Sequence, residues 1–352
     1  MTNSEIVQAL ARWSHHPGFG PYARQALMRA ARRLLEEESS LAGRATAGTL
    51  TKLVRVGPFV ARTIRELLDG SRAALPPLEE WSAEDRALYE ATDLSRDHFI
   101  AVRDARRSVA EAGWPRPSGD LQIHTAWSDG AASPRAMVAA AHRLGYRFAA
   151  ITDHTQGLRF AGGMTVQKMR RQRQILARLN DQAPIRVFAG AETNITATCT
   201  LDLEREELAG LEIVLAGCHA ALRRTEDQTP RMLAAVTQPS VHVLVHGRGR
   251  MFGVPRGIRA RWDEVFAAAA DHHTAIEINA YPDRQDLDFT LAGPAARAGC
   301  LISLGTDSHA IRHLGWMDVA VAHLIRAAIP RERVLNYWSL PELERWLGAK
   351  RG

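Results

Sequence analysis

The stretch GDLQIHTAWSDG, residues 119–130, begins with a short apolar run and continues into a histidine and a carboxylate, His124 and Asp129. Similar apolar runs recur from here towards the C-terminus, separated by stretches with helical periodicity. The predicted strands are residues 121–125, 148–152, 185–189, 213–216, 241–245, 275–279 and 301–305. Strands that alternate with helices indicate a parallel α/β sheet, and a barrel naturally closes seven of them. We therefore predict an α/β barrel in this part of the chain.

Six of these seven predicted strands carry possible metal ligands at or just beyond their ends. The residues are His124 and Asp129, Asp153 and His154, Glu192, His219, His246, and Asp307 and His309, whereas Asn279 ends the sixth strand. A single histidine at a strand end is more often a structural residue, and an Asp-His pair can cap a helix. Chance is a poor explanation for six of seven strand ends in a chain with 14 histidines. Because barrel enzymes build their sites at these ends, we expect the side chains to converge.

The ligand types predict the chemistry of this site. Imidazoles and carboxylates without a thiolate suit manganese, zinc or iron, and the eight of these residues other than Asp153 are more ligands than one ion needs. We predict two or three divalent ions per chain, with Glu192 as a bridging ligand. Clustered dications hydrolyse phosphate esters by activating water and by holding the phosphate oxygens. Four arginines follow strand ends and are predicted to hold the phosphate, although surface ion pairs would explain each of them equally well: Arg159, Arg248, Arg250 and Arg284.

Composition limits the class of protein. Hydrophobic residues make up 46% and charged residues 24% of the 352 residues, which is ordinary for a globular protein. There is no apolar run of 18 residues, and the N-terminus lacks the pattern of a secretory signal. The three cysteines form no Cys-x-x-Cys pair, which argues against a disulfide framework or a thiolate zinc site. We therefore expect a cytoplasmic protein that does not bind membranes.

The net charge of +6 is concentrated at the front of the chain. Residues 1–72 contain eleven Lys and Arg against six Asp and Glu, whereas residues 73–118 contain six against nine. A local basic surplus favours a polyanionic partner such as DNA, although a solvated basic surface would look the same. We predict a helical domain at 1–72, a helical linker at 73–118 and the metal-dependent domain at 119–352.

The stretch LTKLVRVGPFVARTIRELLDG, residues 50–70, predicts two helices joined by a short turn at Val56-Gly57-Pro58. This segment resembles the helix-hairpin-helix motif, which binds the DNA backbone through N–H groups of the hairpin. Arg55 stands where the motif usually has its first glycine. The resemblance implies DNA contacts by Arg55, Val56, Gly57 and Arg62. A plain helical pair with an apolar core is the alternative.

The barrel region resembles the PHP (polymerase and histidinol phosphatase) superfamily. The matching motifs, in order, are residues 119–130, Ile151-Thr-Asp-His-Thr155, Gly190-Ala-Glu192, Cys218-His219, His246-Gly-Arg-Gly-Arg250, Glu277-Ile-Asn-Ala280 and Thr306-Asp-Ser-His309. The resemblance covers about residues 119–345 and implies a distorted seven-stranded (β/α)7 barrel with up to three metal ions. It also implies catalytic roles for Asp153, His154, Glu192 and Asp307.

The family resemblance further implies how the ligands are shared. One ion would be held by Gln122, His124, Glu192 and Asp307, a second by Glu192, His219 and His246, and a third by Asp129, His154 and His309. Gln122 stands where the family usually has the first histidine of His-x-His. An amide oxygen is a harder and weaker ligand than imidazole, so this first site would bind its ion more loosely or prefer manganese.

Residues 4–70 resemble the N-terminal helical domain of bacterial family X DNA polymerases, whose C-terminal domain is a PHP domain. Only about 45 residues separate the two regions here, too few for a polymerase palm, and they contain no Asp-x-Asp pair. The resemblance implies a 3′–5′ DNA exonuclease or end-processing enzyme without polymerase activity. Two alternatives stay open: a small-molecule phosphomonoesterase of the histidinol-phosphatase type, and a non-catalytic DNA-binding protein with a structural PHP domain.

Overall fold

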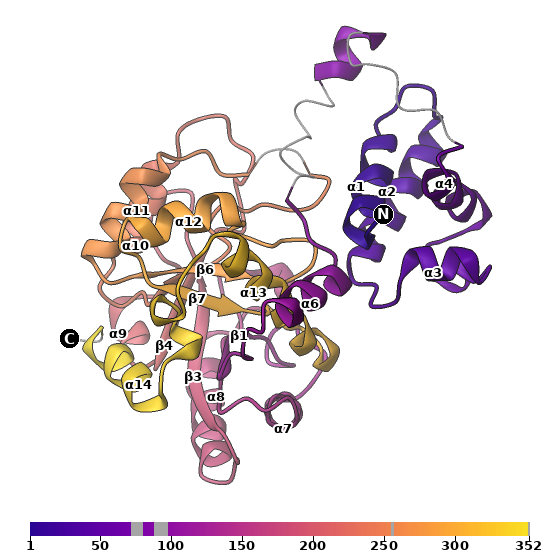
Figure 1. Ribbon diagram of the computed structural model, residues 1–352. Coiled ribbons are helices and arrows are strands. Elements are labelled where there is room, and N and C mark those ends of the chain that lie inside the picture. The colour runs from indigo at the N-terminus through magenta and orange to yellow at the C-terminus, as the bar shows by residue number, and fades with distance from the viewer. Residues whose placement is uncertain (72–79, 88–97, 255–256, 351–352) are drawn as a thin grey trace. The chain divides into compact units, whose positions relative to one another are not determined.

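The structure is a computed structural model that describes residues 1–71, 80–87, 98–254 and 257–350 (Figure 1). It divides into two compact units. The helical unit contains Met1–Ala112 together with Arg250–Arg256, and the barrel unit contains Gly113–Gly249 together with Gly257–Gly352. Among the described residues, no helix is long and apolar enough to cross a membrane.

The barrel unit is built on seven parallel strands that follow one another in chain order. They are β1 (Gly119–Ile123), β2 (Phe148–Ile151), β3 (Arg186–Asn194), β4 (Ile213–Gly217), β5 (Val243–Leu244), β6 (Ala275–Asn279) and β7 (Ile302–Gly305). A parallel bridge between Ile123 and Ser308 brings the first strand beside the last, and the His124 N–H donates to the Ser308 carbonyl at 2.9 Å. The predicted seven-stranded α/β barrel is thereby confirmed.

Helices cover the outside of this sheet and connect its strands (Figure 1). They are α7 (Pro134–Arg143), α8 (Val166–Asn180), α9 (Arg205–Leu208), α10 (Thr229–Val236), α11 (Trp262–Asp271), α12 (Phe289–Arg297), α13 (Met317–Arg326) and α14 (Leu340–Ala349). Short 3₁₀ turns add η3 (Arg159–Ala161), η4 (Ile311–Trp316), η5 (Arg331–Arg333) and η6 (Leu335–Tyr337). One buried cluster packs Phe148 and Phe188 of the strands against Leu343 and Leu347 of α14. This apolar packing fixes the strands whose ends carry the polar residues.

Several strand boundaries differ from those predicted, and the third and fifth strands differ most in length. The third strand was expected to end at residue 189, but β3 runs on to Asn194, so Glu192 lies inside a strand and pairs with Leu215. The fifth was expected over 241–245, but β5 contains only Val243 and Leu244. In the sequence, the polar residues at the end of β3 do not look like part of a strand. The backbone of β3 nevertheless stays paired with β4 as far as Asn194, because parallel pairing depends on backbone partners.

The helical unit packs short helices around an apolar core. It contains α1 (Asn3–Trp13), α2 (Pro21–Leu35), α3 (Leu41–Thr46), η1 (Leu50–Lys52), α4 (Pro58–Asp69) and α6 (Val102–Glu111). Leu10, Leu27 and Ile64 lie in the core, and so does Phe252 from the second segment of the unit. The capping box of α1, made by Thr2 and Glu5, satisfies the first free N–H groups of that helix.

The predicted helical pair at 50–70 is corrected in its first half. Leu50–Lys52 forms only a single 3₁₀ turn, whereas α4 follows the predicted second helix. Gly48 has a φ of 67°, so the backbone leaves the helical region just before this turn. In the predicted linker 73–118, α6 belongs to the helical unit, and residues 72–79 and 88–97 lie outside the described residues.

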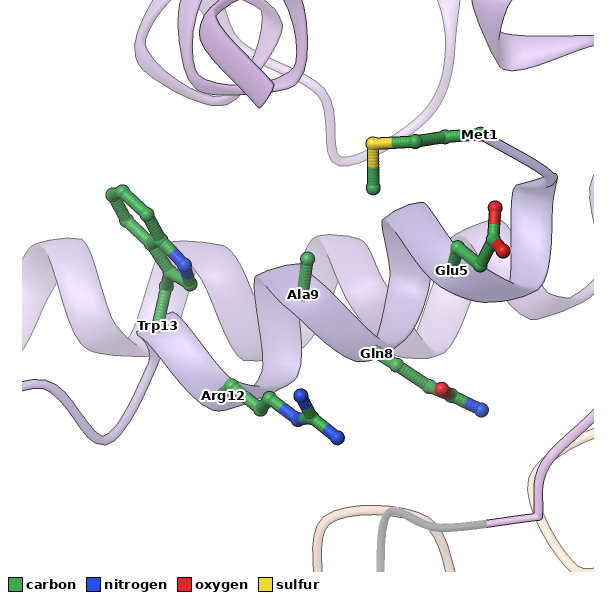
Figure 2. Close-up of a pocket in the computed structure, with 6 residues that line it drawn as sticks. All are labelled: Met1, Glu5, Gln8, Ala9, Arg12 and Trp13. Carbon is green, nitrogen blue, oxygen red and sulfur yellow. The ribbon is translucent and has the colours of Figure 1, made fainter. Parts of the chain in front are cut away.

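A shallow pocket lies along one side of α1 (Figure 2). Its lining residues are Met1, Glu5, Gln8, Ala9, Arg12 and Trp13. The lining combines one acid, one base and one amide with three largely apolar side chains, and it includes none of the predicted site residues. The strand ends of the barrel unit are therefore the place to look for the functional site.

Asp120 joins the first strand to the end of the last. Its carboxylate accepts hydrogen bonds from the Thr306 N–H at 3.1 Å, from the Thr306 hydroxyl, and from the Gln122 N–H at 3.2 Å. The side chain is fully buried, and this burial outweighs the hydrogen bonds and raises the pKa of Asp120 to about 7. Asp120 therefore keeps its proton in the folded protein at pH values where the unfolded chain has lost it.

We expect Asp120→Asn to flatten the pH dependence of stability. Because the folded pKa is about 7 and the unfolded value is near 3.8, Asp120 reduces the free energy of unfolding as pH rises from about 4 to about 7. The variant should gain stability relative to the wild type across this window, measured by urea unfolding at several pH values. Asp181→Asn, at an exposed position, is the control. A difference between variant and wild type that does not change with pH would contradict the prediction.

Candidate metal centre

The predicted ligands meet at one end of the barrel because each follows, or ends, a parallel strand. His124 follows β1, His154 follows β2, Glu192 lies near the end of β3, and His219 and His246 follow β4 and β5. Asp307 and His309 follow β7, and Asp129 lies in the turn after His124. Glycines end β4 and β7, and a Cβ on Gly217 would come within 2.6 Å of the His246 ring and 2.9 Å of Glu192. The glycine at that position therefore leaves room for the cluster.

Glu192 lies at the middle of the cluster, and its two oxygens face different histidines. Oε1 lies 2.8 Å from His219 Nε2 and 2.7 Å from His246 Nε2. Oε2 lies 3.2 Å from His124 Nε2 and 3.6 Å from His154 Nδ1. One carboxylate thus connects imidazoles from four strands, which is the arrangement of a bridging ligand.

The remaining ligands extend the cluster on the other side of His124. Asp307 Oδ1 lies 3.1 Å from His124 Nε2, and Asp129 Oδ2 lies 3.3 Å from His309 Nε2 and 3.7 Å from His154 Nε2. Three groups of ligand atoms are close enough to hold an ion each: His124, Asp129, His154 and His309; His154, Glu192 and His219; and His124, Glu192 and Asp307. The structure therefore brings together all eight His, Asp and Glu ligands predicted from the sequence, with His246 joined through Glu192.

The chemistry of these donors fits divalent cations. Buried ring nitrogens of His124, His154 and His219 have no hydrogen-bond partner, although carboxylate oxygens lie close to them. Orphaned polar atoms of this kind are costly in a protein interior unless something else satisfies them. Lone pairs that converge without hydrogen-bond geometry are arranged as ligands around ions. The group that these residues fit is a set of divalent metal ions.

Electrostatics at the cluster favours the same conclusion. Burial lowers the pKa of His154 to about 3 and also lowers the pKa of His219, so both rings are neutral and able to act as ligands. Burial raises the pKa of Glu192, but the surrounding histidines outweigh it and hold that pKa well below its ordinary value. Burial lowers the pKa of His124, but hydrogen bonds to Asp307 and Glu192 outweigh it and raise that pKa well above its ordinary value. A metal ion bound between these carboxylates and rings would take the place of the His124 proton.

Several ligands are held in place by contacts that the sequence did not predict. His219 Nδ1 lies 3.2 Å from the amide oxygen of Asn194, and His309 Nδ1 lies 2.7 Å from the Asp307 carbonyl. The His246 N–H donates to Glu277 Oε2 at 2.8 Å. Such contacts fix the orientation of a ligand ring and tune its basicity. No periodicity reveals them, because each partner comes from a different part of the barrel or from a main-chain atom.

Two of the ligands have an unusual backbone. His246 has a φ of 31° and Asp307 a φ of 53°, in the left-handed region that favours glycine. A residue with a side chain adopts this region only where its surroundings enforce it, and such residues concentrate at functional sites.

Asp153 holds the loops of the site rather than joining one of the three ligand groups. Its carboxylate accepts hydrogen bonds from the Thr125 N–H at 2.7 Å and hydroxyl at 2.6 Å, and from the Ser128 hydroxyl at 2.7 Å. It also accepts one from the Gln172 amide of α8 at 2.5 Å. Asp153 thus fixes the turn that carries Asp129, and its catalytic role stays a prediction.

Gln122 turns its amide towards the bridging carboxylate. Its Nε2 donates to Glu192 Oε2 at 2.9 Å, and its Oε1 accepts from Asn279 Nδ2 at 3.4 Å. The side chain is buried, so these neighbours decide its orientation. In this orientation Gln122 supports Glu192 from outside the ligand set, and a role as a ligand stays a prediction.

The four predicted phosphate-binding arginines lie in different places. Arg284 Nε lies 3.2 Å from Asp307 Oδ2, and Arg248 Nη1 lies 3.7 Å from Asp288. Arg159 is exposed in η3. Arg250 belongs to the helical unit, where its guanidinium lies 3.9 Å from the centre of the Phe99 ring. Because Arg250 is buried against that ring, we leave it out of the proposed substrate contacts.

Comparison with known proteins identifies relatives of the barrel unit. The family model of the PHP domain matches residues 120–280. The chain is 34% identical over 231 residues to the DNA polymerase/3′-5′ exonuclease PolX of Bacillus subtilis, a match that covers 65% of this chain and 40% of PolX. This similarity is homology to the PHP domain of PolX.

Shorter relatives match over most of their own length. The probable phosphatase YcdX of Escherichia fergusonii is 30% identical, and the probable phosphatase Ent638_1550 of Enterobacter sp. is 31% identical. Each match covers 62% of this chain and 89% of the relative. A solved histidinol phosphate phosphatase from Lactococcus lactis, complexed with zinc, L-histidinol and phosphate, superposes with a TM-score of 0.44 at 17% identity, covering 60% of this chain and 94% of that one.

Substitutions at Gln122 test its contact with Glu192. We expect Gln122→Ala to weaken metal binding by about 10–100-fold, the usual effect of losing a partner that orients a ligand. We expect Gln122→His to strengthen it, because an imidazole adds a ligand to the group of His124, Glu192 and Asp307. Chelator competition and metal analysis by mass spectrometry measure affinity and stoichiometry. Gln182→Ala, at an exposed position, is the matched control. Equal affinity and stoichiometry in all four proteins would refute the role of Gln122.

Proposed function

This chain belongs to the PHP domain family, and from that premise we propose that its metal centre hydrolyses phosphodiester bonds in nucleic acid. The activity we propose is a 3′–5′ DNA exonuclease or end-processing reaction without polymerase activity. The observation that carries the proposal is the set of three ligand groups linked to one another by His124, His154 and Glu192, in one chain with a helical unit that presents a basic hairpin.

The residues of the cluster have different proposed roles in the reaction. Divalent manganese, zinc or iron ions, two or three per chain, would supply Lewis acidity that activates water and neutralises phosphate oxygens. His154, Glu192 and Asp307 would hold the ions. Burial raises the pKa of Glu192 and of Asp307, but nearby histidines, with Arg284 beside Asp307, outweigh it and hold both pKa values well below their ordinary range. Arg284 is half-buried beside Asp307, where its guanidinium can hold a phosphate oxygen. Arg159 and Arg248 would contact the phosphodiester further from the reacting bond.

The helical unit supplies the proposed contact with the DNA backbone. No side chain caps the start of α4 at Gly57, and its first turn contains no acid, so its N–H groups and dipole are available to a phosphate. Arg55 has a φ of 68°, the conformation that a glycine usually provides in such a hairpin. Val56 is buried and anchors the turn, and Arg62 is exposed on the first turns of α4. The homology to PolX, a DNA polymerase and exonuclease by its name, supports DNA as the partner.

A phosphomonoesterase is the second candidate function. Two relatives named as probable phosphatases match over 89% of their length, whereas the match to PolX covers only 40% of that protein. The helical unit argues against this candidate, because a small phosphate ester needs no contact with a DNA backbone. A third possibility, a DNA-binding protein with a structural PHP domain, predicts fewer than one bound ion per chain.

Manganese-loaded protein should shorten end-labelled DNA, and His154→Ala and Asp307→Ala should abolish this cleavage. Both residues contribute to the ligand groups, so each loss opens at least one of them. Gel electrophoresis of 5′-labelled and 3′-labelled oligonucleotides measures the rate and the polarity. His142→Ala, at an exposed position of α7, is the control. Hydrolysis of a phosphomonoester without cleavage of DNA or RNA would favour the second candidate instead.

Charge reversal at the hairpin should weaken DNA binding without affecting the chemistry. We expect Arg55→Glu and Arg62→Glu each to lower duplex affinity and to reduce the slope of log affinity against log salt by about 1. Hydrolysis of bis(p-nitrophenyl) phosphate should stay at the wild-type rate. Arg29→Glu, exposed on α2 of the same unit, is the control. An unchanged salt slope in both hairpin variants would exclude this hairpin as the DNA contact.

A further inference from the structure

We propose that the barrel unit carries a binding track for single-stranded nucleic acid, formed by the exposed ring of Phe160 and a stripe of cations along α8. The inference rests on the proposed nuclease function, because it describes how a strand would reach the metal centre. It does not depend on the hairpin of the helical unit. Both parts of the track lie in the segment between β2 and β3.

Phe160 is held away from the protein by a well-anchored turn. Its side chain is 83% exposed, whereas Leu158 and Ala161 on either side are buried. Backbone hydrogen bonds close the turn, from the Gly162 N–H to the Arg159 carbonyl and from the Gly163 N–H to the Leu158 carbonyl, both at 3.1 Å. An aromatic ring that a fixed turn presents to water provides a flat surface on which a base can stack.

This turn lies against two segments that carry metal ligands. The Met164 N–H donates to the His154 carbonyl at 2.8 Å. On the other side, a Cβ on Gly162 would come within 3.1 Å of the carbonyl oxygen of Ser128, the residue before Asp129. Asp129 and His309 are also the most exposed ligands, at 31% and 25%, whereas the other ligand side chains are at most 7% exposed. Phe160 therefore lies in a turn next to the segment that carries Asp129, one of the two most exposed ligands.

The cations lie on one outward stripe of α8. This helix contains five basic residues and no acid. Its buried residues are Met169, Gln172 and Leu176, spaced by three and four. Lys168, Arg171, Ile175 and Arg178 follow the same spacing on the outer face, where all four are exposed. From Lys168 to Arg178 the stripe extends about 15 Å along the helix axis.

These cations form no ion pairs within the part of the chain that the structure describes. None of Lys168, Arg171 and Arg178 forms an ion pair with a described carboxylate, while Arg186 on β3 pairs with both Glu212 and Glu344. Surface helices usually mix both signs, which keeps the local field small. A stripe of one sign is complementary to a polyanion and attracts it over several ångströms.

The two features together select a single strand. Phosphates along the α8 stripe would be attracted whether they belong to one strand or two. A base can stack on Phe160 only when it is unstacked from its neighbours, which a duplex prevents and a single-stranded end allows. Because α8 begins two residues after Met164, a strand on the stripe would lead to the turn beside His154.

Two sets of variants test the track in the full-length protein. We expect Phe160→Ala to lower the affinity for a fluorescent single-stranded oligonucleotide roughly tenfold, and Phe160→Trp to retain it. The triple variant Lys168→Glu, Arg171→Glu, Arg178→Glu should lower the slope of log affinity against log salt by about 2. Fluorescence anisotropy at several salt concentrations measures both. Arg135→Glu with Arg143→Glu, exposed on α7, is the matched control. Thermal unfolding verifies that each variant is folded.

The outcomes separate this inference from the proposed function. Single-strand affinity unchanged by Phe160→Ala, or a salt slope unchanged by the triple variant, would overturn the track. Equal losses for an oligonucleotide and for poly-glutamate, with no effect of Phe160→Ala, would identify a general polyanion surface and also overturn it. Hydrolysis of bis(p-nitrophenyl) phosphate by the manganese-loaded variants should match the wild type, because the track does not touch the reacting bond. A wild type that hydrolyses this ester but cleaves no oligonucleotide refutes the nuclease function, and the binding data still decide the track.

Discussion

The carboxylate of Glu192 is the constraint around which the barrel end is organised. It is buried and charged, and the groups nearest to its oxygens are imidazole nitrogens and one amide. A buried charge needs compensation, which imidazoles supply when they are protonated or when they share cations with the carboxylate. The seven-strand arrangement meets that need, because ligands from separated parts of the chain reach one carboxylate at the ends of neighbouring strands.

The sequence predicts the convergence of these side chains because the signal lies in their positions along the chain. A histidine or acid directly after an apolar run marks the end of a parallel strand, and parallel strands align their ends. The roles of Gln122 and Glu277 could not be predicted in the same way. The amide of Gln122 points as it does because Glu192 and Asn279 approach it from other strands. Burial and the nearby Asp307 raise the pKa of Glu277 well above its ordinary value, so this buried acid lies beside the ligands without sharing their charge.

At the hairpin, the sequence and the structure lead to different conclusions about Arg55. Arg55 in place of a glycine weakens the match to the motif, since glycine is the residue that adopts a positive φ without strain. The structure nevertheless has Arg55 at a φ of 68°, with Val56 buried behind it. Arg55 therefore adopts the backbone conformation that glycine favours, in a turn where the neighbouring Val56 is buried. The sequence motif scores only the missing glycine, whereas the burial of Val56 is visible only in the structure.

Arg250 lies in the helical unit, although it follows the fifth strand of the barrel unit in the sequence. The chain ends β5, places His246 at the metal centre, and within four residues enters the helical unit. There Phe252 lies in the apolar core, and Arg32 donates to its carbonyl at 3.1 Å. Removal of the N-terminal residues would leave Phe252 without the core that buries it, on the loop that follows a metal ligand. Loss of activity in such a truncation would therefore reflect disruption of the metal centre as much as loss of DNA contact, and single surface substitutions are the sharper means of separating the two.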